Sequence, residues 1–351
     1  MSVQICDSSA CDSPVMVEVR RGSTVESCHR GRAVVADASG RVVASWGDSE
    51  APIIPRSAVK PIQALPLVES GALYAYGLEQ YELALACGSH HGEGRQVRML
   101  ESWMKRIGCQ PGDLACGAHA PLDEEATVEL IRSGQAATVI HNNCSGKHLG
   151  MLTTARHLGE PLKGYTAPEH PVQQRIQAIL QDLTGCALGD GPALVDGCGA
   201  PTFAVPLRGL AVAMARFADT DGFEPARVTA LDTVRNAWSR HASFIGGRTS
   251  FDTKLMQSLP GTVLVKSGAE GVVVAVLTRQ KLGLALKIED GAPRAKNVAL
   301  MALLRHLGVI DAGRWQSLSE LAAPVVTNWS GKVVGGVRPA EGWLNEAYTR
   351  G

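Results

Sequence analysis

Two short elements, each with a serine and a lysine, give this chain the side chains for nucleophilic catalysis. Ser57 and Lys60 are three residues apart at the start of an expected helix, so they lie one turn apart, and a neutral amine there could accept the serine proton. Lys266 follows the apolar segment 263–265 and is itself followed by serine and glycine. A Ser-x-x-Lys element followed in this order by Lys-Ser-Gly predicts acyl transfer through a serine nucleophile with lysine bases.

The same residues also fit a purely structural role. Serine is a favoured N-cap residue, Pro61 restricts the first helical turn, and Ser-x-x-Lys alone describes many solvated helix faces. Lys60 separates the two interpretations, because burial or a nearby ammonium group such as that of Lys266 would lower the pKa of its amine and allow it to act as a base. A solvated Lys60 would contradict the catalytic interpretation.

Three loops contain further groups that could bind or react. Residues 87–93 carry a serine and two histidines after an apolar helix, residues 141–151 form the densest polar cluster, and residues 194–201 place an acid and a thiol between glycines. The first loop could also be a glycine-terminated helix end with solvated histidines. Cys144 and Cys198, in the other two loops, could supply half of a tetrahedral zinc site, act as reactive thiols or be small buried side chains. Their spacing leaves these alternatives open, because no Cys-x-x-Cys pair occurs.

Composition limits the classes of partner. The 351 residues include 34 Lys and Arg and 34 Asp and Glu, so no overall field favours nucleic acid or an anionic membrane, and a small neutral or zwitterionic substrate fits better. The chain has neither a basic start followed by an apolar stretch nor a run of about 18 apolar residues. We therefore expect a soluble cytoplasmic protein with reduced thiols, whose partners include neither nucleic acid nor membranes.

The elements expected along the chain place strands at both ends and helices between them. Strands are expected at residues 15–19, 33–36, 41–46, 262–265, 272–277, 282–288 and 332–337. Helices are expected at residues 57–70, 78–87, 95–107, 123–133, 146–158, 171–184, 207–217, 225–241 and 295–307. This order predicts an α+β fold, in which an antiparallel sheet formed from both chain ends carries flanking helices and an inserted helical lobe.

We expect a single domain over residues 1–351. Its sheet lobe would comprise about residues 15–50 and 250–340, and its helical lobe about residues 51–250. The tail, residues 1–14, contains Cys6 and Cys11 and is expected to be disordered or expendable.

Six short motifs occur in a fixed order along the chain. They are Arg56-Ser57-Ala58-Val59-Lys60-Pro61, Cys87-Gly88-Ser89-His90-His91, Cys116-Gly117-Ala118-His119, Asn142-Asn143-Cys144-Ser145-Gly146-Lys147-His148, Asp196-Gly197-Cys198 and Lys266-Ser267-Gly268-Ala269-Glu270-Gly271. Together they closely resemble the motifs of the rhizobial-type, class 3 L-asparaginases of the asparaginase II family. The match is colinear over roughly residues 18–338. The resemblance implies a fold similar to that of serine β-lactamases and glutaminases.

The resemblance also implies a site with two Ser-Lys pairs and a zinc ion. The implied catalytic residues are Ser57, Lys60, Ser89 and Lys266, the implied zinc ligands are Cys144, Lys147 and Cys198 with a water, and the implied substrate-binding residues are Arg56, Asp196, His148 and Asn143. Lysine must be neutral to bind a metal, and the ion itself supplies that pKa shift. Asp196 would hold the α-amino group of the substrate or a metal-bound water, and Arg56 would orient the site or meet the α-carboxylate.

The implied activity is hydrolysis of the side-chain amide of L-asparagine to L-aspartate and ammonia, by a homodimer in which zinc aids binding. We favour Ser57 as the nucleophile, assisted by Lys60, with Ser89 and Lys266 relaying protons. One alternative is a glutaminase or another Ser-Lys amidohydrolase or acyltransferase on the same scaffold, since one methylene gives only about 1 to 3 kcal/mol of discrimination. The other is a non-catalytic zinc or thiol sensor that uses the two loop cysteines.

Overall fold

The computed structural model describes residues 13–188 and 193–346. Cys6 and Cys11, in the expected tail, lie outside the described residues. The chain divides into two compact units. The first comprises the chain up to Ile53, Val205–Asp219 and the chain from Ser267 onward, and the second comprises Ile54–Ala204 and Thr220–Lys266.

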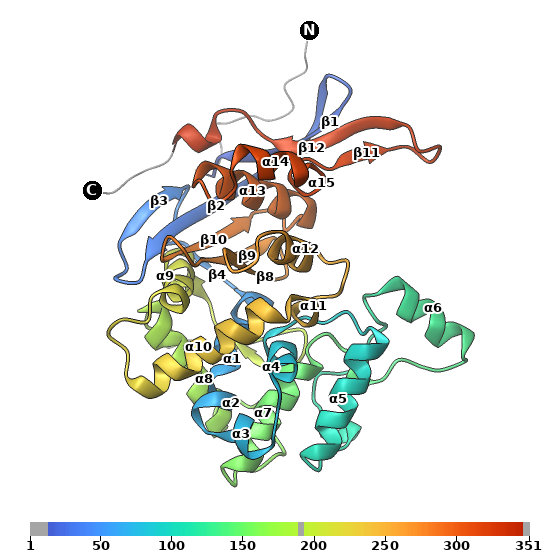
Figure 1. Ribbon diagram of the computed structural model, residues 1–351, viewed down its shortest axis with the longest axis vertical. Helices are drawn as coiled ribbons and strands as arrows, with labels where there is room; N and C mark the ends of the chain where they lie inside the picture. The colour runs from blue at the N-terminus through green and yellow to red at the C-terminus, as the bar shows by residue number, and fades with distance from the viewer. Residues whose placement is uncertain (1–12, 189–192, 347–351) are drawn as a thin grey trace. The chain divides into compact units, whose positions relative to one another are not determined.

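The first unit is built on an antiparallel sheet whose strands come from both ends of the chain. The N-terminal strands are β1 (Val15–Arg21), β2 (Thr24–Asp37) and β3 (Val42–Trp46), and the C-terminal strands are β9 (Val272–Leu277), β10 (Leu282–Ile288), β11 (Val325–Thr327) and β12 (Val333–Pro339). Their order is β11-β12-β1-β2-β10-β9, with β3 also paired to β2, so strands drawn blue and strands drawn orange to red lie side by side (Figure 1). The predicted α+β fold with an antiparallel sheet from both chain ends is therefore confirmed.

Apolar side chains cover both faces of this sheet. All residues of β9 and residues 33–36 of β2 are buried, so side chains that point to opposite faces are both removed from water. Helix α9 (Leu207–Ala218) packs against β2, β9 and β10, and α13 (Pro293–His306) packs against β1, β10 and β12. The unit also contains β4 (Pro52–Ile53) paired with β7 (Val205–Pro206), α14 (Ala312–Ser317), α15 (Ser319–Ala322) and the 3-10 segment η4 (Trp343–Glu346).

The second unit is mainly helical. Its helices are α1 (Lys60–Gln63), α2 (Leu65–Glu69), α3 (Ala72–Ala75), α4 (Gln80–Cys87), α5 (Gly94–Arg106), α6 (Glu124–Arg132), α7 (Ser145–His157), α8 (Pro171–Thr184), α10 (Pro225–Arg240), α11 (Ala242–Ile245) and α12 (Phe251–Ser258). It also contains the 3-10 segments η1 (Arg56–Val59), η2 (Pro111–Asp113) and η3 (Val139–His141) and the hairpin of β5 (Leu194–Val195) and β6 (Pro201–Thr202). Strand β8 (Val263–Ser267) leads out of this unit.

Two buried helices form the centre of the second unit. Residues 83–87 of α4 and residues 145–155 of α7 are all buried, as expected for helices surrounded by other helices. Helix α4 packs against α1, α7 and α10, and α5 packs against α7. The approach of α7 to α4 is so close that a Cβ at Gly146 would lie 2.4 Å from Leu85 O. These helices position two of the expected site residues, because Ser89 follows α4 and Lys147 lies in the first turn of α7.

The structure corrects the first expected helix. Residues 57–70 form η1, α1 and α2 rather than one helix, because Pro61 and Pro66 each stand in a first turn and lack the N–H that would join one turn to the next. Strand β2 begins at Thr24, well before the expected residue 33, and its polar first half pairs with β1.

The borders of the two units also differ from the expected lobes. Helix α9 belongs to the sheet unit, and residues 251–266 belong to the helical unit. That the two units make up a single domain stays a prediction.

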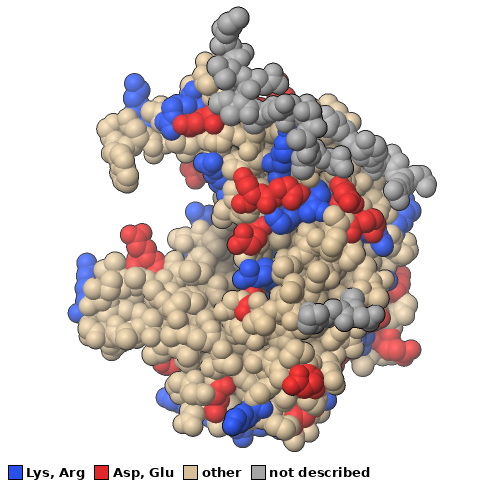
Figure 2. Space-filling model, turned by 180° about the vertical axis from the view of Figure 1, so that it is seen from behind, with Lys and Arg blue, Asp and Glu red and all other residues tan. Residues whose placement is uncertain are grey.

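Several expectations from composition can be compared with the described residues. Among them, no helix is long and apolar enough to cross a membrane. On the face drawn in Figure 2, acidic and basic side chains are mixed, as the equal numbers in the sequence suggest. Cys87, Cys109, Cys116, Cys144, Cys186 and Cys198 have free thiols. The expectation of reduced thiols is correct for these six and wrong for Cys28, which is disulfide-bonded.

We expect Gly146→Ala to destabilise the second unit. The added Cβ would overlap the Leu85 carbonyl, and overpacking of this kind costs about 1–3 kcal/mol of unfolding free energy. Gly150→Ala, one turn along the same helix, is the matched control, since its Cβ would meet its nearest neighbour, the Ala86 Cβ, at an ordinary 3.4 Å. Urea unfolding followed by circular dichroism measures both variants. Equal stability of the two would contradict the close contact between α4 and α7.

Candidate active site

Ser89 lies between two lysine amines. Its Oγ is 3.0 Å from Lys60 Nζ and 3.1 Å from Lys266 Nζ. Lys60 begins α1, Ser89 follows α4 and Lys266 lies in β8, so three separate segments of the second unit bring these groups together. Both lysine side chains are buried, with relative exposures of 0% and 1%. The solvated Lys60 that would have contradicted a catalytic role is therefore not observed.

The contacts of Lys60 suit a base. Its Nζ lies 2.7 Å from Gly88 O and 3.1 Å from Asn143 O, in addition to its contact with Ser89 Oγ. Burial lowers the pKa of Lys60, although the nearby Cys144 sulfur acts in the opposite direction. A neutral amine has two protons and one lone pair, and the two carbonyl oxygens can only accept. The Cys144 sulfur also hydrogen-bonds Lys60, so the amine keeps a third proton while that sulfur is a thiolate, and only the neutral amine has a lone pair for the hydroxyl proton of Ser89.

Ser57 stands on a strained turn. Arg56, directly before it, has a φ of +50°, in the left-handed region that residues other than glycine seldom adopt. Among the described residues, no hydrogen bond joins the half-buried Ser57 hydroxyl to Lys60, whose contacts lie on the Ser89 side. The i, i+3 spacing thus brings no hydrogen bond between the two side chains. A sharp, strained turn that exposes a serine hydroxyl is also how α/β-hydrolases present their nucleophile.

Arg56 and Asp196 form an ion pair. The guanidinium Nε donates to Asp196 Oδ1, and Asp196 Oδ2 lies 3.8 Å from Lys147 Nζ. Burial opposes ionisation of Asp196, but Lys147 and Arg56 hold the pKa of its carboxyl below its ordinary value. The structure therefore brings these two expected substrate-binding residues together as an ion pair.

Cys144, Lys147 and Cys198 converge beside this ion pair. Lys147 Nζ is 2.9 Å from Cys198 Sγ, and the two sulfur atoms also interact with each other. Hydrogen bonding from Cys198, assisted by the charges of Lys60 and Lys147, lowers the pKa of Cys144 well below its ordinary value. The same hydrogen bond raises the pKa of Cys198, so the shared proton stays there. Burial acts against the charged form of Lys147, but the two sulfurs and Asp196 raise its pKa.

These three side chains fit the expected zinc site. Two sulfurs and one nitrogen are donors that zinc accepts in proteins, and they leave a fourth position for water. A thiolate at Cys144 is the state that a metal requires, whereas Lys147 would have to lose a proton on binding. Within residues 13–188 and 193–346, no group of three His, Cys, Asp or Glu side chains could hold a metal ion. The expected site therefore depends on its lysine, and zinc binding stays a prediction.

His148 and Asn143 occupy different surroundings. His148 is fully buried, and its Nδ1 lies 2.5 Å from the hydroxyl of Tyr165, which accepts a backbone N–H. The hydroxyl therefore donates to Nδ1, and the ring proton lies on Nε2, which has no partner within the described part of the chain. Asn143 accepts from Lys60 through its carbonyl and donates its N–H to His119 Nε2 at 3.0 Å. Asn143 thus contacts a candidate catalytic residue, whereas substrate contact by His148 stays a prediction.

The backbone at Ser89 is held by a glutamine that the sequence did not single out. Ser89 N donates to Ile245 O at 2.7 Å. The buried amide of Gln96 accepts from two backbone N–H groups of the loop after Ser89, at 3.1 and 3.0 Å, and donates to the carbonyls of Ser243 and Gly246 at 2.9 and 2.7 Å. Gln96 therefore ties the loop after Ser89 to the segment that accepts the Ser89 N–H.

His90 connects the Ser89 loop to the start of α7. Its Nδ1 accepts the Gly92 N–H at 3.1 Å, and its Nε2 lies 2.8 Å from Ser145 Oγ. Burial, assisted by the charge of Lys60, lowers the pKa of His90 to about 3, so the ring is neutral. The sequence left open a solvated histidine at this position, and the structure shows a buried one.

We expect the neutral His90 to make the stability of the protein fall in acid. An unfolded histidine titrates near 6.5, whereas folded His90 titrates at about 3, so the unfolded state binds the proton first as the pH falls below about 6.5. Between these two values the linkage removes about 1.4 kcal/mol of unfolding free energy per pH unit.

Urea unfolding of the wild type and of His90→Asn, at several pH values between about 7 and 5, measures this effect. The asparagine carbonyl can still accept the Gly92 N–H, and the other histidines are common to both proteins. The wild type should lose stability more steeply than the variant as the pH falls. Parallel curves would show that the folded protein does not lower the pKa of His90.

Comparison with solved structures gives distant matches. Mglu in its native form matches with a TM-score of 0.43 and 14% identity, over 81% of this chain and 62% of that chain, so this chain spans less than two thirds of its length. A β-lactamase from Mycobacterium bovis matches with a TM-score of 0.42 and 12% identity, over 79% of this chain and 94% of that chain. A D-alanine carboxypeptidase from Burkholderia cenocepacia matches with a TM-score of 0.42 and 10% identity, over 80% and 93%.

Comparison with protein families is decisive, whereas comparison with curated proteins gives no significant match. The family model for L-asparaginase II matches residues 17–339. This match contains all eleven residues expected at the site and almost the whole of the described chain. The chain therefore belongs to the L-asparaginase II family of amidohydrolases.

Proposed function

We propose that this chain is an L-asparaginase, which hydrolyses the side-chain amide of L-asparagine to L-aspartate and ammonia. The family match supports the reaction, and the position of Ser89 Oγ between two buried lysine amines supports the chemistry. A hydroxyl between two amines can pass a proton from one to the other, as general acid–base catalysis at an amide requires. A zinc or thiol sensor would have no use for this arrangement, since burial of each amine disfavours folding.

The reaction proceeds through an ester of Ser57. Its Oγ attacks the side-chain carbonyl carbon, and its proton passes to Lys60, the first member of the relay formed with Ser89 and Lys266, once substrate binding brings Ser57 Oγ within hydrogen-bond distance of the amine. The relay gives a proton to the amide nitrogen, the C–N bond breaks and ammonia leaves. Water then attacks the ester and returns a proton through the relay to Ser57, which releases L-aspartate. Both serines are half-buried, but the strained turn at Arg56 and the absence, among the described residues, of a lysine contact at the Ser57 hydroxyl support this role for Ser57, whereas Ser89 Oγ is held by an amine on each side.

The Arg56–Asp196 pair carries the two charges that complement the ends of an amino acid. Asp196 would hold the α-ammonium group and Arg56 the α-carboxylate, so the substrate exchanges one ion pair for two. Arg56 directly precedes the proposed nucleophile, which places the recognised end of the substrate near the reacting end. A glutamine substrate would differ by one methylene, which gives only about 1 to 3 kcal/mol of discrimination.

Zinc enters the proposal as an aid to binding. Cys144, Lys147 and Cys198 would hold the ion, and its positive charge would favour the anionic groups of the substrate. Asp196 contacts both Lys147, at 3.8 Å, and Cys198, at 3.7 Å. The residue that would hold the substrate ammonium group is thus also the neighbour of the metal ligands. The homodimer and the cytoplasmic location implied by the resemblance stay predictions.

Ammonia release from L-asparagine tests the roles of the two serines. We expect Ser57→Ala to lower kcat/KM by about 10⁴-fold or more, as for loss of a nucleophile, and Ser89→Ala by about 10²–10⁴-fold, as for loss of a proton relay. Ser133→Ala, at an exposed helix end, should leave the rate unchanged and is the matched control. Quenched reactions analysed by mass spectrometry should trap the ester on residue 57.

Other outcomes of this experiment change specific parts of the proposal. An ester on residue 89, with most activity kept in Ser57→Ala, would transfer the nucleophile role to Ser89. Faster turnover of L-glutamine than of L-asparagine would make the chain a glutaminase. No ammonia from either amide, with folded wild type, would contradict the proposed function.

Metal content tests the zinc site separately from turnover. We expect the purified wild type to contain zinc and Cys198→Ala to lose most of it, because the variant removes one of three protein ligands. Cys109→Ala, which removes a buried thiol in the same unit but none of the proposed ligands, should keep the metal. Elemental analysis after dialysis gives the zinc content of each protein, with circular dichroism as the check on folding. Equal zinc in the two variants would exclude Cys198 as a ligand.

A further inference from the structure

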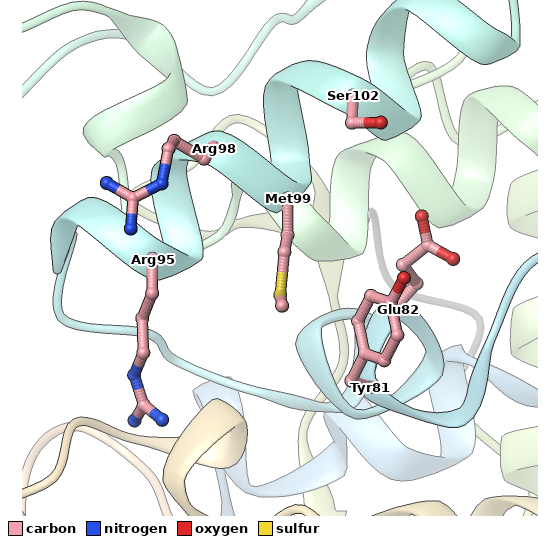
Figure 3. A pocket seen from close by; sticks show the side chains of 6 residues that line it. All are labelled: Tyr81, Glu82, Arg95, Arg98, Met99 and Ser102. Atoms are coloured by element: carbon pink, nitrogen blue, oxygen red, sulfur yellow. The ribbon is translucent and has the colours of Figure 1, made fainter.

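A hollow of about 190 Å³ lies between α4 and α5, away from the proposed catalytic and metal residues. It is lined by Tyr81 and Glu82 of α4 and by Arg95, Arg98, Met99 and Ser102 of α5. The α5 residues recur at spacings of three and four, so they share one face of that helix. Figure 3 shows the two arginines on one side of the hollow, Tyr81 and Glu82 on the other, and Met99 between them. The hollow therefore has two arginines on one side, a buried glutamate that also pairs with Arg106 on the other, and an apolar side chain in the middle.

The positive side has unused hydrogen-bond donors. Arg98 is exposed and has no hydrogen bond or ion pair to other described residues. Arg95 donates from Nε to Glu93 Oε2 at 2.9 Å and from Nη2 to Ser243 O at 3.3 Å. An arginine has five N–H donors in a planar fork, so both guanidinium groups can donate further to an anion.

The negative side has one acceptor position left. Glu82 Oε1 lies 3.0 Å from Arg106 Nη2, and Oε2 accepts from Glu79 N at 2.8 Å and from Arg106 Nη1 at 3.3 Å. A carboxylate has about four acceptor positions, so one remains after these three contacts. The Tyr81 hydroxyl in the same wall can also accept a hydrogen bond.

We propose that this hollow binds a small zwitterionic amino acid, with its carboxylate on Arg95 and Arg98 and its ammonium group toward Glu82 and Tyr81. Arginine suits a carboxylate because its N–H groups match the two oxygens. The volume is below the roughly 300 Å³ at which pockets for drug-sized ligands begin, which favours a ligand of amino-acid size. An inorganic phosphate would satisfy the arginines but would bring negative charge against Glu82.

Arg95 connects the hollow to Ser89. Its guanidinium lies 4.8 Å from the centre of the Phe244 ring and donates to Ser243 O, and Ile245 O accepts the Ser89 N–H. A carboxylate bound by the remaining Arg95 donors would draw the guanidinium into the hollow and away from Ser243 O, which then keeps its 2.9 Å contact with Gln96 Nε2, and so would alter the packing of the segment that holds Ser89. Turnover should fall while the hollow is occupied, a step that rests on the proposed function.

Isothermal titration with L-aspartate tests binding in the hollow. Arg98→Ala removes an exposed side chain that has no hydrogen bond or ion pair within the described part of the chain, and Lys105→Ala removes the same charge from an exposed position of α5 that does not line the hollow. We expect Arg98→Ala to bind one equivalent of L-aspartate fewer than the wild type does, and Lys105→Ala to bind as many as the wild type. This difference does not depend on how much L-aspartate binds at the catalytic residues. Succinate, which has the same carbon skeleton without the amine, should bind the hollow about tenfold or more weakly. Equal stoichiometry in the three proteins, or equal affinity for succinate, would overturn the proposal.

Turnover gives a second measurement that separates this inference from the proposed function. If the chain releases ammonia from L-asparagine, L-aspartate should lower kcat about fivefold or more in the wild type but not in Arg98→Ala, whereas competition at the active site raises only KM. If the chain releases no ammonia, the proposed function is contradicted, but the titration still shows whether the hollow binds L-aspartate. A kcat that L-aspartate leaves unchanged in wild type would overturn the link to Ser89.

Discussion

The burial of two lysine amines against one serine hydroxyl is the constraint on which the second unit depends. An amine removed from water loses favourable hydration, and the unit compensates Lys60 by turning the carbonyls of Gly88 and Asn143 toward it. Those carbonyls follow the end of α4 and precede the start of α7. The close packing of these two helices, which a glycine at position 146 permits, therefore sets where the oxygen atoms around the amine lie. The packing of α4 against α7 therefore serves both the core of the unit and the position of the Lys60 amine.

Two buried lysines of this unit have pKa values that move in opposite directions. Lys60 contacts the carbonyl oxygens of Gly88 and Asn143, and burial lowers its pKa although the Cys144 sulfur acts in the opposite direction. Lys147 is equally buried, but the sulfurs of Cys144 and Cys198 and the Asp196 carboxylate raise its pKa. Groups whose surroundings push their pKa values apart are suited to different tasks. The same residue type can thus serve as a proton acceptor at one position and as a held cation, or a metal ligand after losing its proton, at the other.

The sequence predicted the parts of the structure that depend on local pattern. Apolar strands at both chain ends were recognisable from residues such as Val272–Leu277, which are buried throughout. The expected single helix at residues 57–70 is wrong because Pro61 and Pro66 have no N–H to continue the hydrogen bonding of the preceding turn. The hydrogen bond between Ser89 and Lys60 joins residues 29 positions apart, and no rule of sequence spacing predicts such a contact. Gln96 looked like an ordinary polar position of an amphipathic helix, since its four partners are backbone groups without any signature in the sequence.

The left-handed backbone at Arg56 lowers the stability of the protein at a residue that we propose binds the substrate. An L-residue in this region is disfavoured by roughly 1–2 kcal/mol, a sizeable fraction of the net stability of about 5–15 kcal/mol that typical domains have. Glycine would adopt the same backbone without strain, but it would remove the guanidinium that pairs with Asp196. The strain relieved by glycine would therefore be set against a nearly buried carboxylate that has lost its guanidinium partner, so the backbone conformation at Arg56 and the charge of Asp196 depend on each other.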